Sequence, residues 1–301
     1  MERALRLAAA VLLAAAMVGA AGRLRAAREK PYDVEVIPTA AAVRWLTLGH
    51  ALTGANLYWL RTVQYIGEPR ADERGWERLH PLVNLVTDLD PGHGYAYQVA
   101  GIVLSSAGRI DESNAILEKG SRNVKDRYIL PYLRAFNAFY HQGDWDTAGH
   151  WAEIAARTPG APPHVRQNVL AYYVKGQRAE AALEFLETVR REAQDDETRK
   201  ALDGQIQQAL LERDAGKVDE AVKRYTEVHG RWPPTLLTLV TEGYIDRIPP
   251  DPYGGKLVLG KDGRVTSSVH AYRLAPAPTA SELTDPNLGP ALQHVKPASP
   301  P

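Results

Sequence analysis

Four polar side chains near the middle of the chain have the types and spacing that could support chemistry. His141 and His150 are expected on adjacent helices, where they could face each other as two metal ligands, but no third ligand is placed nearby. Asp144 and Asp146 flank Trp145, as paired catalytic carboxylates can, but carboxylates at this place also favour the start of a helix. We interpret the histidines as a surface pair and the aspartates as helix-starting residues.

Other signatures of catalysis are missing from the sequence. Gly92-His93-Gly94 is followed by aromatic residues and has no lysine of the kind that a phosphate-binding loop needs, so it is interpreted as a helix-starting turn. Ser267-Ser268 has no base motif nearby. The 301 residues include no cysteine, which excludes disulfides, thiolate metal sites and cysteine nucleophiles. We therefore predict a protein that is not an enzyme and binds no cofactor and no metal.

The charge balance argues against a nucleic-acid partner. Lys and Arg number 36, Asp and Glu also number 36, and the formal net charge is zero. General binding of nucleic acid needs a basic surplus to neutralise phosphates. Tyr (14) and Trp (6) outnumber Phe (3), which suits half-buried positions between helices.

Small residues recur along the chain at a regular spacing. Gly108, Gly143, Gly176 and Gly216 follow one another at similar intervals, and each has mostly small or apolar residues at matching offsets on both sides. Around Gly108 these include Gly101, Ser113 and Gly120. The marker glycine is expected to end a first helix in a left-handed conformation, and the small residues are expected where the two helices cross closely.

This pattern resembles the tetratricopeptide repeat (TPR) family, whose unit is a helix–turn–helix of about 34 residues. The resemblance covers about residues 75–233 and implies an all-α, right-handed solenoid of helical hairpins, with four TPR-like repeats in residues 91–233. The third unit departs from the family pattern at Asn168 and Val169, and the fourth at Gln208, so these units should be less regular. An unrelated array of helical hairpins is the alternative.

The repeats are expected to be preceded by a capping helical hairpin in residues 40–90. Ala40–Ile66 has the apolar periodicity of one long helix, and Trp76–Leu89 would form its partner. A helical array of this kind needs such a cap to cover the end of its apolar core.

Residues 234–268 predict a short helix followed by a small β-hairpin. The helix would run from Leu236 to Glu242 and end at Gly243, and the strands would be Leu257–Leu259 and Arg264–Ser267. The remaining residues, 269–301, are rich in proline and are expected to be a disordered tail.

The run Asp251-Pro252-Tyr253-Gly254 resembles the carboxy-terminal part of the type II secretion major pseudopilins, with Tyr in place of their Trp. The resemblance is confined to the short stretch around this run and no pilin-type amino-terminal helix is present, so only the local fold is carried over. In that family the region can hold calcium, which would make Asp251 and Asp262 oxygen ligands. A proline-stiffened turn that caps the last helix is the preferred interpretation.

Residues 1–22 are expected to be a signal or anchor segment. The apolar core, Leu7–Ala21, has the length of a signal-peptide core and is short for a spanning helix. We favour an uncleaved anchor because Arg23, Arg25, Arg28 and Lys30 follow it; a cleaved signal and a buried Ala-rich helix are the alternatives. The positive-inside rule narrowly favours a cytoplasmic body, but the pseudopilin resemblance favours a periplasmic body at a bacterial inner membrane.

The function expected from this layout is a protein-interaction scaffold, since it also looks like membrane-associated repeat proteins of Gram-negative envelope and pilus systems. A peptide or protein segment would lie in the groove formed by the first helix of each unit, where Tyr, Asn and Arg side chains can hydrogen-bond an extended backbone. The expected groove residues are Tyr97, Gln98, Tyr132, Arg134, Asn137, Tyr140, Gln167, Asn168 and Tyr172. An accessory subunit of a membrane complex, held through the hairpin, and a cytoplasmic regulator are the alternatives.

Overall fold

The computed structural model describes residues 36–68 and 76–274. The expected signal or anchor segment, residues 1–22, and residues 275–301 lie outside the described residues. All described helices and strands belong to one unit that begins at Thr39. None of the helices in the described ranges is both long and apolar enough to cross a membrane.

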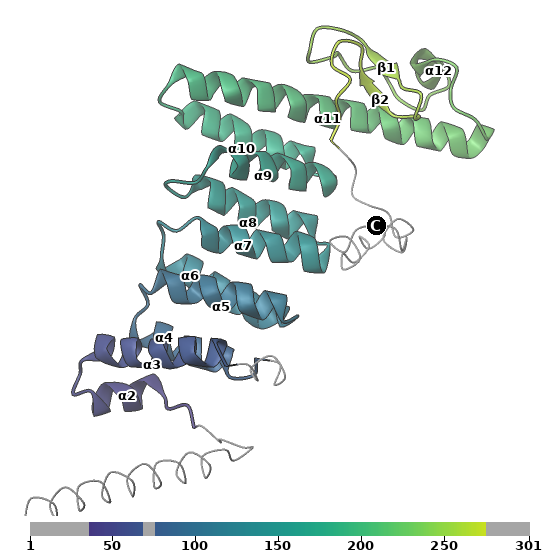
Figure 1. Ribbon diagram of the computed structural model, residues 1–301. Coiled ribbons are helices and arrows are strands. Elements are labelled where there is room, and N and C mark those ends of the chain that lie inside the picture. The colour runs from purple at the N-terminus through teal and green to yellow at the C-terminus, as the bar shows by residue number, and fades with distance from the viewer. Residues whose placement is uncertain (1–35, 69–75, 275–301) are drawn as a thin grey trace, which may run out of the picture. The chain divides into compact units, whose positions relative to one another are not determined.

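The described residues are mostly helical, and helices adjacent in the chain lie side by side (Figure 1). A π-helical turn, η1 (Ala138–Gln142), continues α7. The helices are α2 (Ala40–Leu46), α3 (Ala51–Ile66), α4 (Leu79–Leu89), α5 (Gly94–Ser106), α6 (Ile110–Asn123), α7 (Ile129–Asn137), α8 (Trp145–Arg157), α9 (Pro163–Lys175), α10 (Ala179–Glu192), α11 (Asp196–His229) and α12 (Leu236–Thr241).

The small residues of the first unit lie where α5 and α6 cross, as predicted. A Cβ atom at Gly120 would come 2.7 Å from Cγ of Tyr97, so the tyrosine ring occupies the space that a side chain would need. Ser113 donates a hydrogen bond of 2.7 Å from Oγ to the carbonyl oxygen of Gly101. Small side chains therefore allow the two helix backbones to approach closely.

The marker glycines divide into those that make left-handed turns and those that do not. Gly108 and Gly143 have φ of 75° and 65° and end their helices as predicted. Gly176 has φ of −76°, and the left-handed residue is its neighbour Gln177, with φ of 60°. Gly176 is small for a different reason, because a Cβ atom there would lie 3.2 Å from Cβ of Trp145.

The turn predicted at Gly216 is wrong, because α11 continues through this residue as one helix of 34 residues. Gly216 is not among the residues with positive φ. The helical turns on both sides of Gly216 carry an apolar stripe that packs on the carboxy-terminal hairpin and α12 and that includes Leu211, Val218 and Val222. A break at Gly216 would remove part of this stripe from the core, so the fourth helical hairpin does not form.

The long helix predicted for Ala40–Ile66 is also wrong, since it is broken between α2 and α3. Leu48 and Gly49 have φ of 52° and 86°, which end α2. The chain folds back so that a Cβ atom at Gly54 would lie 2.5 Å from Cγ1 of Val43. The partner helix α4 begins later than predicted, after Trp76, which has φ of 60°.

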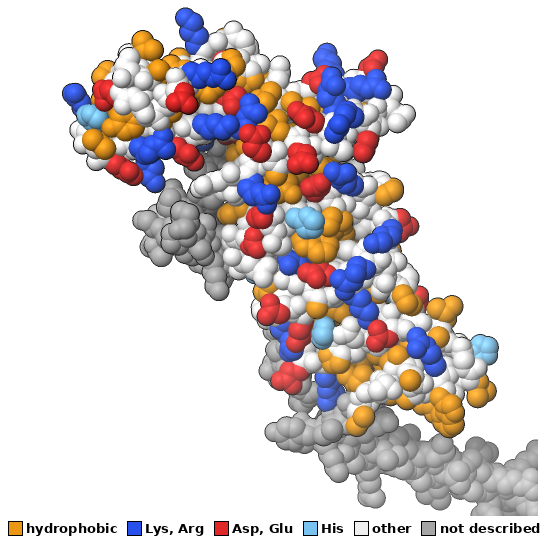
Figure 2. Space-filling view, turned by 180° about the vertical axis from the view of Figure 1, so that it is seen from behind, with side chains coloured by type: hydrophobic (Ala, Val, Ile, Leu, Met, Phe, Trp, Pro, Cys, Tyr) orange, Lys and Arg blue, Asp and Glu red, His pale blue; other side chains and the backbone are white. Residues whose placement is uncertain are grey.

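The outer side of this first hairpin does not have the polar surface expected of a cap. Figure 2 shows hydrophobic side chains gathered at the end formed by α2 and α3, whereas charged side chains of both signs are spread over the neighbouring helices. Trp45 and Leu60 are 79% and 61% exposed. Among the described residues, the apolar surface of the array is therefore not closed at this end.

The carboxy-terminal hairpin forms as predicted. β1 (Leu257–Leu259) pairs antiparallel with β2 (Val265–Ser267), with Leu257 opposite Ser267 and Leu259 opposite Val265. Gly263 in the turn has φ of 80°, and a Cβ atom there would lie 2.8 Å from the ring of Trp232. α12 ends before Gly243, which has φ of 77°.

The prediction that the tail is disordered from residue 269 is wrong for residues 269–274, which pack along α11. Arg273 forms an ion pair of 2.8 Å with Glu212, and the backbone N–H of Leu274 donates to the same carboxylate at 2.6 Å. Leu274 also packs against a core cluster built from α7 to α11. The buried charge of Glu212 explains this order, because it needs a cation from another part of the chain.

Candidate partner-binding surface

Of the nine predicted groove residues, Tyr97, Asn137 and Tyr172 are buried, so their assignment to an open groove is wrong. The Tyr97 hydroxyl donates to the carbonyl oxygen of Pro91 at 3.3 Å and accepts from Asn123 Nδ2 at 2.9 Å. Burial raises the pKa of Tyr97. The ring is held inside because it fills the space left by a glycine on the facing helix.

Asn137 is 1% exposed and joins three helices through its amide group. Its Nδ2 donates to Ser113 Oγ at 2.8 Å and to Asn114 Oδ1 at 2.9 Å, and its Oδ1 accepts from Ser105 Oγ at 2.7 Å. His141 Nε2 lies 3.0 Å from Ser105 Oγ at the edge of the same network. The network satisfies polar groups inside the core, so Asn137 is a structural residue.

Tyr172 and Arg134 are also used inside the helix array. The Tyr172 ring stacks on Phe139 with centroids 5.1 Å apart, and burial raises its pKa. The Arg134 side chain is 11% exposed, donates from Nε to Glu118 Oε1 at 2.8 Å, and lies 5.7 Å from the ring centroid of Trp151. Neither side chain can be offered to a partner without breaking these contacts.

The other five predicted residues remain at least partly accessible. Gln167 is exposed, and Gln98, Tyr132, Tyr140 and Asn168 are half-buried. Gln98 accepts from Arg127 at 2.7 Å. Tyr140 stacks on Phe136 with centroids 5.0 Å apart.

The structure brings Tyr132 and Asn168 together across α7 and α9. Asn168 Nδ2 donates to the Tyr132 hydroxyl at 3.4 Å, and the ring of His164 lies edge-on to the Tyr132 ring with centroids 6.1 Å apart. We call these three residues the α7–α9 polar cluster. The sequence prediction missed His164, although its place four residues before Asn168 puts both on one face of α9.

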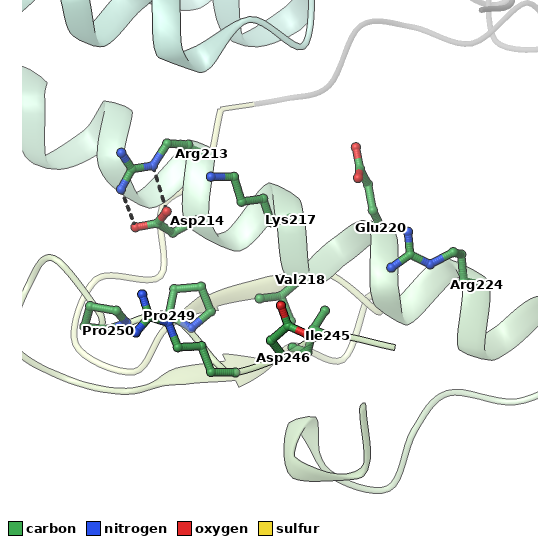
Figure 3. A pocket seen from close by; sticks show the side chains of 11 residues that line it. Arg213, Asp214, Lys217, Val218, Glu220, Arg224, Ile245, Asp246, Pro249 and Pro250 are labelled. Atoms are coloured by element: carbon green, nitrogen blue, oxygen red, sulfur yellow. Dashed lines mark hydrogen bonds and ion pairs between the residues drawn. The ribbon is translucent and has the colours of Figure 1, made fainter. Parts of the chain in front are cut away.

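A second accessible site lies between α11 and the segment Ile245–Pro250, where the structure has an open pocket of about 700 Å³ (Figure 3). Its lining mixes both signs of charge with proline and consists of Arg213, Asp214, Lys217, Val218, Glu220, Arg224, Ile245, Asp246, Arg247, Pro249 and Pro250. Arg213 binds Asp214 through two hydrogen bonds of 2.7 and 2.9 Å, which raise the pKa of Arg213. The sequence prediction did not include this pocket, because it arises only where α11 continues past Gly216.

The residues first considered for metal or acid–base chemistry have structural partners. Asp144 begins α8 by accepting from the backbone N–H of Thr147 at 2.9 Å, and Asp146 pairs with Arg178. His150 is exposed beside Trp151. Within residues 36–68 and 76–274, no group of three or more His, Cys, Asp or Glu side chains is placed to hold a metal ion.

Asp251 and Asp262, the possible calcium ligands, are likewise used within the hairpin region. Asp251 accepts from Ser267 Oγ at 2.7 Å and from the backbone N–H of Tyr253 at 2.9 Å. Asp262 accepts from the backbone N–H of Arg264 at 3.1 Å. These bonds explain both aspartates as turn-forming residues.

Comparison with known proteins does not assign the chain to a family. No family model matches it, and no curated protein matches its sequence significantly. A solved structure that it resembles is that of Naa15/Naa10 bound to HypK-THB, with a TM-score of 0.34 and 11% sequence identity. The similarity covers 63% of this chain and 29% of that chain, so this protein spans less than a third of its length.

Proposed function

We propose that the chain is a non-enzymatic protein-interaction scaffold, built as a TPR-like right-handed solenoid, that binds an extended protein segment across α7 and α9. The observation that carries this proposal is the α7–α9 polar cluster. Tyr132 and Asn168 come from the first helices of consecutive hairpins, and both are partly accessible. Their hydroxyl and amide groups can donate to and accept from a peptide backbone, and the tyrosine ring supplies apolar contact area.

Photo-crosslinking tests this assignment. A photoreactive residue at Gln167, which is exposed beside Asn168, should form adducts with a partner in cells, whereas one at Glu187 on α10 should not. The variant Tyr132→Ala/Asn168→Ala should lose the adduct while its far-UV circular dichroism stays unchanged. An adduct that persists in this variant, or that forms equally at Glu187, would contradict binding of a partner across α7 and α9.

The proposed location is a bacterial inner membrane, with residues 1–22 as an uncleaved anchor and the body in the periplasm; a soluble periplasmic protein with a cleaved signal is the alternative. The apolar segment and the four basic residues after it support the anchor. A periplasm-active reporter should be fused after Pro301 and not after Ser268, because residues 269–274 pack on α11. An inactive reporter would instead indicate a cytoplasmic regulator.

The pocket between α11 and Ile245–Pro250 favours a second function, an accessory subunit of a membrane complex held through its carboxy-terminal region. Deletion of residues 243–268 would uncover the apolar stripe of α11, so point variants are the better test. Lys217→Glu/Arg247→Glu reverses two charges of the pocket lining without touching the core. Loss of the complex in this variant, with the Gln167 adduct retained, would favour the second function.

A further inference from the structure

The end of the helix array formed by α2 and α3 exposes a concentration of large apolar side chains. We define the apolar end face as Trp45, Leu46, Leu52, Leu57, Leu60 and Val63, whose exposed fractions lie between 47% and 79%. Eight of the 17 large apolar side chains that are exposed in the described part of the chain lie between Val36 and Val63. Apolar side chains concentrated in this way mark a surface that contacts something other than water.

Helix α3 has two apolar sides, of which the described residues cover only one. Gly54, Ala55, Thr62 and Tyr65 are buried on the side that faces the rest of the array. Leu52, Leu57, Leu60 and Val63 lie on the opposite side, within an arc of about 140° at about 100° per residue. The exposed leucines are therefore not needed for the packing of α3 against α4.

The charge of this region indicates which partner it fits. No Asp or Glu occurs between Val36 and Gly67, although the whole chain has 36 acidic residues. Arg44 and Arg61 are the Lys or Arg residues of this stretch, and both are exposed. Arg44 also donates to the carbonyl oxygen of Asp88 at 2.6 Å. Surfaces that bind anionic bilayers typically combine leucine and tryptophan with basic residues and lack acidic ones. Interfaces with other proteins are typically bordered by a polar rim, to which acidic residues can also contribute.

The sequence before α2 places this face within reach of a membrane. The apolar segment that is proposed to enter the bilayer ends at Gly22, and residues 23–38 connect it to Thr39. A connection of this length spans at most about 55 Å when fully extended. It carries four basic residues, Arg23, Arg25, Arg28 and Lys30, and three acidic residues, Glu29, Asp33 and Glu35. Its net charge of +1 also favours an anionic surface, and its basic residues are the four charged residues nearest to the apolar segment apart from Glu29.

We propose that the apolar end face lies on the surface of a lipid bilayer that contains anionic phospholipid. This contact is separate from the N-terminal segment, and the inference rests on the proposed membrane anchoring. The face inserts leucine and tryptophan side chains among the headgroups, while the polar helices of the array remain in water. The bilayer thereby takes the place of the polar cap that α2 and α3 lack.

Site-specific fluorescence can test this contact in the full chain, which has no cysteine of its own. Single variants Leu57→Cys and Leu60→Cys are labelled with an environment-sensitive fluorophore and reconstituted into vesicles of phosphatidylethanolamine and phosphatidylglycerol. Leu237→Cys on α12 is the matched control, because Leu237 and Leu60 are both 61% exposed. Flotation with the vesicles is measured separately, and flotation of the Trp45→Glu/Leu52→Glu variant, whose end face is no longer apolar, reports the anchor.

The labels at positions 57 and 60 should shift to shorter emission wavelengths and be quenched by bromine-labelled lipids, and the label at 237 should do neither. Trp45→Glu/Leu52→Glu should abolish the shift at position 60 while the chain still floats. If the protein floats but the labels at 57 and 60 are as accessible to an aqueous quencher as the label at 237, the inference is overturned and the anchor stands. A shift that disappears at low protein-to-lipid ratio would assign the face to a second copy and also overturn it. If the chain does not float with the vesicles, both the proposed anchor and this inference are contradicted.

Discussion

Gly101 and Leu117 pack against each other where α5 crosses α6. A Cβ atom at Gly101 would lie 2.5 Å from Cδ2 of Leu117 and 2.7 Å from its Cγ, distances that real side chains do not adopt. Leu117 is fully buried, so its side chain has no free space into which it could move. The crossing of the two helices therefore depends on the missing side chain at position 101.

We predict that Gly101→Ala lowers the free energy of unfolding by about 1–3 kcal/mol, because overpacking outweighs the better helix propensity of alanine. Gly204→Ala is the matched control, since Gly204 lies within α11 and a Cβ atom there would meet nothing within 4 Å. The control should raise the free energy of unfolding by about 0.5–1 kcal/mol. Urea denaturation of both variants measures the two effects, and a gain in stability for Gly101→Ala would contradict the close contact.

The sequence predicted the glycines of the first two turns because a left-handed residue has a strong local preference for glycine. It failed at Gly216 because glycine is also tolerated inside a helix, and the outcome there depends on distant residues. Leu236, Leu257 and Val265 pack on α11 and favour its continuation, and no periodic pattern in residues 196–229 contains that information. Local signals thus predicted the turns, and tertiary packing decided the long helix.

A pair of glycine substitutions tests this distinction directly. Gly108→Ala should lower the free energy of unfolding by about 1–2 kcal/mol, because Gly108 has φ of 75°. Gly216→Ala should raise it by about 0.5–1 kcal/mol, since Gly216 lies inside a helix and a Cβ atom there would have open space. Differential scanning calorimetry should show melting temperatures that move in opposite directions. If both variants destabilise the protein, Gly216 would have to lie in a left-handed turn, as first predicted from the sequence.

Some of the residues predicted for the groove are buried and others are accessible, for a reason that lies in the residue types. Tyr and Asn suit both a wet groove and a half-buried contact between helices, and the sequence cannot separate the two uses. Tyr97 is inside because Gly120 leaves space for it, and Asn137 is inside because Ser105 and Ser113 supply its partners. Tyr132 and Asn168 stay near the surface, where their polar groups meet.

The buried position of Asn137 leads to a prediction about stability. Asn137→Ala should lower the free energy of unfolding by about 2–3 kcal/mol, because it leaves buried hydroxyl and amide groups without partners. Gln167→Ala, at an exposed position, should change it by less than about 0.5 kcal/mol. Urea denaturation curves followed by circular dichroism provide both values. Equal, small effects at the two positions would mean that Asn137 is accessible after all.

His80 should make stability depend on pH. Burial lowers its pKa more than the charge of Glu112 raises it, and Asn84 Nδ2 lies 3.0 Å from the ring nitrogen Nε2. Because the folded pKa lies below the unfolded value, the unfolded chain binds the proton first as the pH falls below about 6.5. The stability from His80 is therefore present above this value and is lost as the pH falls towards the folded pKa.

Thermal unfolding of the wild type and of His80→Gln can measure this contribution. The wild type should lose more stability than the variant between about pH 7.5 and about pH 5.5, since glutamine does not titrate in this window. The difference between the two proteins should be largest at the acidic end. A variant whose pH profile runs parallel to that of the wild type would show that His80 does not contribute.

Arg273 and Glu212 form a buried ion pair that attaches residues 269–274 to α11. The two side chains are 7% and 1% exposed, with Arg273 Nε 2.8 Å from Glu212 Oε2. Glu212 also accepts from Gln208 Nε2 at 2.8 Å and from the backbone N–H of Leu274 at 2.6 Å. Arg273 additionally lies 3.2 Å from Asp219, a carboxyl group whose pKa is raised by burial.

We predict that Arg273→Met lowers the free energy of unfolding by about 3–5 kcal/mol, because it leaves the Glu212 charge buried without its cation. The double variant Arg273→Met/Glu212→Gln should recover much of this loss, since glutamine keeps an acceptor for the Leu274 N–H and removes the charge. Urea denaturation gives the free energies, and hydrogen exchange at Leu274 reports whether the segment stays on α11. A double variant as unstable as the single one would show that Arg273 acts through its packing, its bond to Val265 or its ion pair with Asp219, and not through the charge of Glu212.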